Sequence, residues 1–260
     1  MVRKISSLLT PSRCLILAFG AIISTADADP LVTDRPDATE SSSVVGMNVV
    51  QLETGISTIE EYSNTSWEVF GTLVRYGLSD KWEARFVLDG YIDECSGGLS
   101  GFGDSEIGFK YYIQPEEGFS PETALIVHTS VPIGKDGLTS DAFDPSFLFS
   151  FSHTLSKTSS LGYNLGASLE SSTDAFGDRT TLASVDYSLA YGFGLTESVG
   201  AYIEIFGSLG MSARESPVHV DGGFTYLLNE DTQFDLFFGS GINDDAPDWF
   251  AGIGFSKRWK

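Results

Sequence analysis

The sequence predicts an all-β chain: a transmembrane antiparallel β-barrel of about twelve strands that follows an N-terminal signal peptide. Three observations predict it: a short apolar leader, long segments in which apolar and polar residues alternate, and connections that alternate between short and long. Of the 260 residues, 42% are hydrophobic and only 20% are charged, which is typical of a folded chain rather than a disordered one. The formal net charge of -21 argues against a nucleic-acid partner, because phosphates require a basic surface.

Residues 1–28 are typical of a secretion signal. Basic residues precede an apolar stretch at 14–23, and Ala26-Asp27-Ala28 then offers a cleavage site before Asp29. The apolar stretch is too short to span a bilayer as a helix. Cleavage would leave Cys95 as the single cysteine of the mature chain, which excludes an intrachain disulfide.

The mature chain divides into about twelve segments that alternate with period two. Each is longer than a typical soluble strand and long enough for a tilted membrane strand. The segments cover residues 47–58, 66–78, 81–92, 104–114, 121–131, 144–156, 159–170, 179–193, 197–208, 217–228, 231–240 and 248–259.

The alternation assigns each strand an apolar face and a polar face. In 231–240, for example, Phe234 and Leu236 oppose Gln233 and Asp235. In 81–92, the apolar face is expected to run from Trp82 through to Ile92. Segment 66–78 carries apolar residues on both faces and leaves the direction of Arg75 ambiguous.

The connections separate a membrane barrel from a soluble β-sandwich. They are expected to be short at 79–80, 114–120, 157–158, 194–196 and 229–230, and longer at 59–65, 93–103, 132–143, 171–178, 209–216 and 241–247. Short turns on one side and longer loops on the other are typical of bacterial outer-membrane barrels with both termini in the periplasm. A soluble all-β domain is the alternative.

Aromatic residues gather near the expected strand ends, as they do where a barrel meets the membrane interfaces. They are Trp67, Trp82, Tyr191, Phe193, Trp249 and Trp259. Outer-membrane proteins usually end on an aromatic residue, whereas here Lys260 follows Trp259.

Several stretches resemble the outer-membrane barrel family named after the meta-pathway of phenol degradation, whose members are often labelled transporters. The stretches are TDRPDATESSSVV (33–45), QLETG (51–55), GFGDSEIGFKY (101–111), LTESVGAYIEIFGS (195–208) and DGGFTYLLNEDTQFDLFFGSGINDDAPDWFAGIGFS (221–256). The resemblance implies a Gram-negative outer-membrane barrel that lets small organic compounds through. Gly46-Met47-Asn48 and the terminal Lys260 depart from the family pattern.

If the apolar faces contact lipid, the opposite faces line the lumen. The expected luminal residues are Glu53, Glu83, Arg85, Asp89, Glu106, Lys110, Asp186, Glu204, Asp221, Asp235 and Arg258. One interpretation is a ladder of cross-strand ion pairs that fixes the shape of the barrel. The other is an acid-rich pore that disfavours anions and admits cations or neutral solutes.

Residues 29–46 are a polar segment ahead of the barrel, which is expected to occupy 47–260. With Asp34, Arg35, Asp37 and Glu40, the segment is either a plug inside the lumen or a periplasmic tail. The expected surroundings are outer-membrane lipid and lipopolysaccharide, which the acidic residues 243–248 would face.

No catalytic, cofactor-binding or metal site is expected. His128 and Ser130 lie two apart on one strand face, but a nucleophile also needs an orienting third group at a recognisable spacing. The first hypothesis is therefore a passive outer-membrane channel for small, aromatic or hydrophobic organic molecules. A non-conducting structural or partner-binding barrel is the second, an outer-membrane hydrolase is a distant third, and the solute and the oligomeric state stay open.

Overall fold

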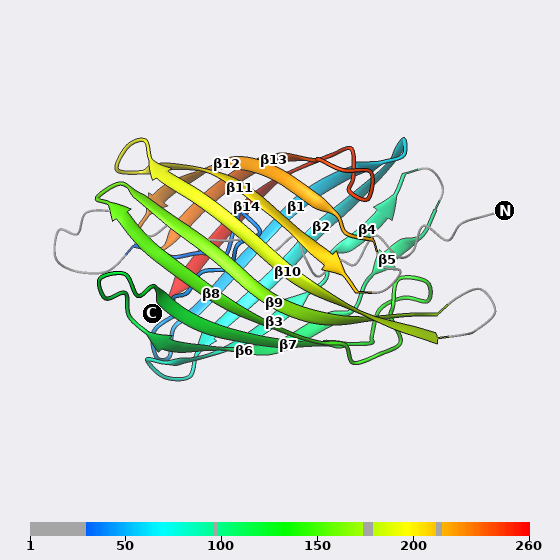
Figure 1. The fold of residues 1–260 in the computed structure, drawn as a ribbon, viewed down its shortest axis with the longest axis horizontal. Helices are drawn as coiled ribbons and strands as arrows, with labels where there is room; N and C mark the ends of the chain where they lie inside the picture. Colours follow the sequence, from blue (N-terminus) through cyan, green and yellow to red (C-terminus); the bar gives the residue numbers. More distant parts are fainter. Residues whose placement is uncertain (1–29, 96–97, 174–178, 212–214) are drawn as a thin grey trace.

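The computed structural model describes residues 30–95, 98–173, 179–211 and 215–260. Its regular structure is a single antiparallel sheet, shown in Figure 1. The expected signal peptide at 1–28 lies outside the described residues. In the described part of the chain, no helix has the length and apolar character needed to cross a membrane. The strands are β1 (Val50–Glu61), β2 (Asn64–Gly77), β3 (Trp82–Leu88), β4 (Tyr91–Glu94), β5 (Ser100–Phe102), β6 (Ser105–Gln114), β7 (Glu122–Val131), β8 (Pro145–Ser156), β9 (Ser159–Thr173), β10 (Arg179–Gly194), β11 (Val199–Gly210), β12 (Val218–Asn229), β13 (Thr232–Gly241) and β14 (Trp249–Trp259).

The sheet closes on itself because β1 pairs with β2 on one side and with β14 on the other. Two places in the ring are each filled by two strands that lie end to end, β3 with β4 and β6 with β5. β3 and β4 pair with successive parts of β2, while β5 pairs with β4 and β6 pairs with β3. The fourteen segments therefore build a barrel of twelve strands, which confirms the predicted fold.

The break between β3 and β4 corrects one assignment. Phe86 and Leu88 are exposed on the outer face, but Asp89 and Gly90 interrupt the strand and shift its phase by one residue. Tyr91 is consequently exposed, and Ile92 is 5% exposed and faces inward. The prediction that Ile92 shares the outer face of Trp82 was wrong for this local reason.

A bulge in β2 explains why this segment looked apolar on both faces. The pairing with β1 passes from Gly71 to Val69 and skips Phe70, which has a φ of 65° and an exposed side chain. An extra residue in one strand reverses the inward and outward positions beyond it. Trp67 therefore faces outward, and Arg75 is fully buried inside.

The first connection is shorter than expected. β1 and β2 continue to Glu61 and Asn64, so the predicted loop 59–65 is a turn of two residues. Tyr62 and Ser63 take φ values of 48° and 65°, the left-handed pair that fits the twist of a tight hairpin. The connections at the other end of the barrel are mostly short, as predicted, and lie on the side where β14 ends.

The two faces of the barrel differ in the predicted sense. On β13, Phe234, Leu236 and Phe238 are about half exposed, whereas Gln233 and Asp235 are buried. Apolar side chains on the outside suit a lipid surrounding, in which every backbone amide must pair within the closed sheet. Four of the six aromatic residues near the strand ends are exposed outward: Trp67, Trp82, Tyr191 and Trp259.

Candidate channel interior

Residues 30–46, here called the N-terminal segment, lie against the inner faces of the strands (Figure 1). The segment starts near the β12–β13 turn, where the Leu31 amide donates to the Glu230 carbonyl at 2.9 Å. It ends near β3, where the Val45 amide donates to Glu83 Oε2 at 2.8 Å. Eleven of the fifteen residues from 31 to 45 are buried, and the other four are half-buried.

Three cations on neighbouring strands form what we call the basic cluster: Arg75 on β2, Arg85 on β3 and Lys110 on β6. Arg75 and Arg85 are direct cross-strand partners, an arrangement that would be repulsive by itself. Glu83 compensates, because its Oε1 accepts from Arg75 Nε and from Arg85 Nη1 at 2.9 Å each. Glu83 on the wall therefore bridges two of the three cations of the basic cluster.

Asp34 of the N-terminal segment completes the cluster. Its carboxylate lies 2.7 Å from Arg85 Nη1, 3.0 Å from Lys110 Nζ and 3.3 Å from Arg75 Nη1. None of these four side chains is more than 1% exposed. Buried charges are tolerated only when they are paired, so removing Asp34 would leave the three cations undercompensated.

Two further carboxylates share these cations. Glu40 Oε2 lies 2.7 Å from Arg85 Nη2, and Glu53 Oε1 lies 3.2 Å from Arg75 Nη1. Glu53 also accepts the Asp34 amide at 2.7 Å. The segment is thus held to the wall through both its side chains and its backbone.

His128 extends the network rather than forming a catalytic pair. Its Nε2 accepts from Arg85 Nε at 3.0 Å, so the proton lies on Nδ1, which donates to Glu106 Oε2 at 3.0 Å. Ser130 Oγ instead donates to the Ala142 carbonyl at 2.8 Å. Both ring nitrogens of His128 are engaged, and no contact between His128 and Ser130 is found among the described residues. Gly108 lies opposite His128, where a Cβ would collide with the imidazole ring.

The opposite wall holds the segment by other contacts. Glu204 on β11 accepts the Ala38 amide at 2.6 Å and the Thr39 hydroxyl. Arg35 pairs with Asp235 on β13 at 3.2 Å. Gly55 and Gly254 are cross-strand partners that make room for Arg35, because a Cβ on either would meet its guanidinium.

The N-terminal segment forms hydrogen bonds or ion pairs with ten of the barrel strands. The wall partners are Gln51 and Glu53 on β1, Arg75 on β2, Glu83 and Arg85 on β3, Lys110 on β6, Glu122 on β7, Ser150 on β8, Asn164 on β9, Ser188 on β10, Glu204 on β11, and Gln233 and Asp235 on β13. A segment with partners on almost every side lies across the lumen rather than along one wall.

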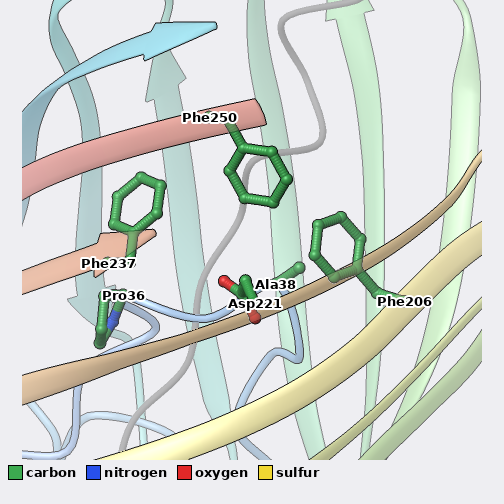
Figure 2. A pocket seen from close by; sticks show the side chains of 6 residues that line it. All are labelled: Pro36, Ala38, Phe206, Asp221, Phe237 and Phe250. Atoms are coloured by element: carbon green, nitrogen blue, oxygen red, sulfur yellow. The ribbon is translucent and has the colours of Figure 1, made fainter. Parts of the chain in front are cut away.

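Sequence reasoning missed an aromatic patch on the inner face of β11 to β14. Phe206, Phe237 and Phe250 line a small pocket together with Pro36, Ala38 and Asp221 (Figure 2). Phe237 and Phe250 are 6% and 5% exposed. The period-two pattern could have predicted that two of these rings face inward, because Phe206 and Phe237 each lie two residues after an acid assigned to the lumen.

The expected luminal residues divide into two groups by burial. Nine are buried: Glu53, Glu83, Arg85, Asp89, Glu106, Lys110, Glu204, Asp221 and Asp235. Asp186 and Arg258 are half-buried, and Arg258 pairs with Asp231 at 2.8 Å near the short-turn end. Lys81, which the period-two pattern of segment 81–92 also assigns to the polar face, is exposed in the turn before β3. That the buried set lines a conducting path stays a prediction.

Comparison with known proteins identifies the family. Residues 33–259 match the model described as "Putative MetA-pathway of phenol degradation", which covers nearly the whole barrel. The chain belongs to this family. The family match confirms the resemblance predicted from the sequence stretches. A search of curated protein sequences found no match to the chain.

Two solved structures share the fold. The COG4313 outer membrane channel from Pseudomonas putida F1 is similar with a TM-score of 0.66 and 11% identity, over 84% of this chain and 98% of that one. The NanC porin is similar with a TM-score of 0.57 and 10% identity, over 80% of this chain and 98% of that one. The fold is that of Gram-negative outer-membrane β-barrels, in agreement with the lipid-facing surface of this chain.

Proposed function

We propose that this protein is a passive outer-membrane channel for small organic molecules, with the N-terminal segment as the constriction of its lumen. The supporting observation is the set of contacts that holds residues 31–45 across the inside of a closed barrel. A barrel of this size lies between eight-stranded barrels with filled interiors and wide porins of 16 or more strands. With the segment inside the barrel, a solute must pass beside it.

The polarity of the interior favours small solutes that are neutral or cationic. Among the buried side chains of the described residues, ten are aspartates or glutamates and four are arginines or lysines. Rings of charged side chains select against ions of like charge, so anions are expected to pass least well. The description of the matching family names phenol degradation, which favours small organic solutes with an aromatic part.

Conductance in planar bilayers tests this proposal. The wild-type barrel is expected to give small, resolvable single-channel steps, and deletion of residues 29–43 is expected to enlarge them several-fold because the constriction is gone. Unchanged conductance after the deletion would contradict the role of the segment. A shift in gel mobility on boiling serves as the folding control, because a closed barrel resists detergent until it is heated.

A second, milder variant tests the role of the segment even if the deletion variant does not fold. Glu40→Gln keeps the shape of the side chain but weakens its ion pair with Arg85, so it is expected to loosen the segment and increase current fluctuations. The absence of any conductance in wild type and in both variants, with correct folding, would favour a closed structural or partner-binding barrel. The observation that favours this second function is the large number of contacts between the segment and the wall, because such contacts would also hold a closed barrel shut.

We also propose that the barrel has no catalytic role. His128 is bound to Arg85 and Glu106, and Ser130 to Ala142, so neither is arranged as a base or an activated nucleophile. The double variant His128→Ala/Ser130→Ala is expected to leave any background esterase activity of purified protein unchanged. A loss of hydrolysis in that variant would overturn this part of the proposal.

A further inference from the structure

The outer rim of the barrel has a gap in its strand pairing between β5 and β9. The pairing of β6 with β7 stops at Ser105 and Val131, and that of β8 with β9 stops at Ser146 and Ser168. β9 nevertheless continues along β10 as far as Thr173, and β5 pairs with β4 alone. Within the described residues, β5 and the outer end of β9 therefore each have one edge without a strand partner.

Residues 132–143, here called the rim loop, fill this gap. On one side, the Lys135 amide donates to the Phe102 carbonyl of β5 at 2.8 Å. On the other side, the Asp144 carboxylate directly after the loop accepts the amide and the hydroxyl of Ser171 on β9, at 2.7 and 2.8 Å. The rim loop thus takes the place that neighbouring strands occupy elsewhere in the ring.

One carboxylate holds the middle of the rim loop. Asp104 Oδ1 accepts the Gly134 amide at 2.9 Å, and Asp104 Oδ2 accepts the amide and the hydroxyl of Ser140 at 2.8 and 2.9 Å. Hydrogen bonds to an ionised acceptor are stronger than those between neutral groups. A single side chain on the wall therefore carries three of the hydrogen bonds that keep the loop in place.

Apolar packing contributes little to this closed position. Two large apolar side chains of the rim loop, Ile133 and Phe143, are 69% and 67% exposed, whereas Ala142 is 6% exposed. A segment that is held by hydrogen bonds and buries little apolar surface opens at a low free-energy cost. Release of the Asp104 contacts is thus the main cost of moving the loop.

The wall beside the rim loop is itself interrupted. Residues 89–90 and 103–104 lie unpaired between the register of β3 with β6 and that of β4 with β5. The Gly90 amide donates to Glu68 Oε1 at 3.2 Å, and the buried Asp89 Oδ2 has no hydrogen-bond partner. A buried oxygen without a partner is costly, and opening of the loop would let water or a solute reach it.

We propose that the rim loop is the outer gate of the channel, closed while Asp104 holds it and open when residues 134–140 leave that carboxylate. Small organic solutes then enter the lumen through the gap between β5 and β9. The inference deepens the proposed channel function by naming its gate, and it rests on that function for the passage of solute.

Cysteine labelling tests the movement of the loop without any need for conductance. In a Cys95→Ser background, Ala142→Cys places a thiol at the buried position of the loop. Asp104→Ala is expected to speed maleimide modification of this thiol at least about tenfold, because three hydrogen bonds to a charged group are lost. An unchanged rate in Asp104→Ala would overturn the proposal.

Asp245→Ala is the matched control for the labelling. Asp245 is also an acid of an outer loop that accepts a backbone amide, from Ser216 at 3.0 Å, but it makes no contact with the rim loop among the described residues. It removes the same charge and is expected to leave the rate unchanged. If Asp104→Ala does not fold, Ser140→Ala removes one of the three hydrogen bonds and is expected to give a smaller acceleration.

Single-channel recording tests whether the loop controls passage. Asp104→Ala is expected to lengthen the open time several-fold, and Asp104→Asn to have a smaller effect, because it loses the charge but keeps one acceptor oxygen. Equal effects of the two variants would mean that charge near the opening sets the current, and they would contradict a gate. Wild-type current that Asp104→Ala leaves unchanged would sink the gate alone. No current in any folded variant, despite faster labelling, would sink the channel function and the gate with it.

Discussion

On each of two walls of the lumen, side chains of like charge lie opposite each other, and the two walls compensate the repulsion in different ways. On β2 and β3, the facing cations Arg75 and Arg85 are bridged by Glu83 and by Asp34 of the N-terminal segment. On β11 and β12, the facing acids Glu204 and Asp221 have neighbouring hydroxyl, amide and aromatic groups but no cation within the described structure. The balanced wall of β2 and β3 anchors the segment through ion pairs, whereas the acidic wall of β11 and β12 holds it through hydrogen bonds to Glu204.

The largest expected loss of stability comes from a substitution on the balanced wall of β2 and β3. Arg85→Met removes a cation that contacts Asp34, Glu40 and Glu83, and it leaves their buried charges undercompensated. Loss of one partner from a buried ionic network typically costs about 3–5 kcal/mol. The midpoint of urea unfolding in detergent measures this loss.

The control for this variant is Arg179→Met at the exposed start of β10, which is expected to change stability by less than about 0.5 kcal/mol. If both variants were equally stable, the anchoring role of the balanced wall would be contradicted.

Substitution of the glycine beside the Arg35 guanidinium is expected to have an intermediate effect on stability. In Gly254→Ala, the added Cβ would collide with the Arg35 guanidinium and approach Asp235, so the ion pair between them must shift. Overpacking of this kind costs about 1–3 kcal/mol.

Gly194→Ala is the matched control, because the nearest atom to its Cβ is 3.8 Å away and nothing has to move. Thermal unfolding of the two variants, followed by the gel shift on boiling, compares them. A Gly254→Ala barrel as stable as Gly194→Ala would show that Arg35 is not confined there.

Ion selectivity tests the acidic wall of β11 and β12 together with the overall excess of buried acids. The open channel is expected to prefer cations over anions at low salt, and the preference should weaken as screening shortens from about 10 Å at 0.1 M to about 3 Å at 1 M. Reversal potentials under a salt gradient measure this preference. Selectivity for anions would contradict the assignment of the acidic faces to the lumen.

The smallest effect is expected at the short-turn end of the barrel. Partial burial acts to raise the pKa of Asp231, but hydrogen bonds from Arg258 and Lys260 outweigh it and lower the pKa below its usual value. A lowered pKa in the folded state means that these contacts stabilise at neutral pH and are lost as the pH falls through that pKa.

Removal of Lys260 is therefore expected to lower the melting temperature slightly at pH 7 and not at all in strong acid. Melting curves of both chains across this pH range measure the difference. A difference that grows towards acid pH would contradict the contact, and slow membrane insertion without loss of stability would assign Lys260 a role in assembly instead.

The sequence pattern predicted the strands and the closed barrel well, because period-two alternation follows directly from one lipid-facing surface. It failed where the backbone breaks that period. The bulge at Phe70 hid the direction of Arg75, and the interruption at Asp89 and Gly90 placed Ile92 on the wrong face.

The interior was harder to predict than the wall. Charged residues could be assigned to the lumen by phase, but their partners depend on which strands close the ring and where the N-terminal segment lies. Phe206 and Phe237 share the phase of luminal acids, yet an apolar side chain was expected to face lipid. The position of Asp34 beside Arg85 and Lys110 could not follow from sequence spacing, since it joins residues 51 and 76 positions apart.

Cysteine accessibility shows whether the N-terminal segment lies inside the folded barrel. In a Cys95→Ser background, Ser42→Cys places a thiol at a position only 2% exposed within the segment, and Met47→Cys places one at a neighbouring position that is 59% exposed. A bulky polymer-linked maleimide is expected to modify Met47→Cys rapidly in the folded barrel and Ser42→Cys only after boiling. Equal and rapid modification of both in the folded barrel would contradict a segment held inside the lumen.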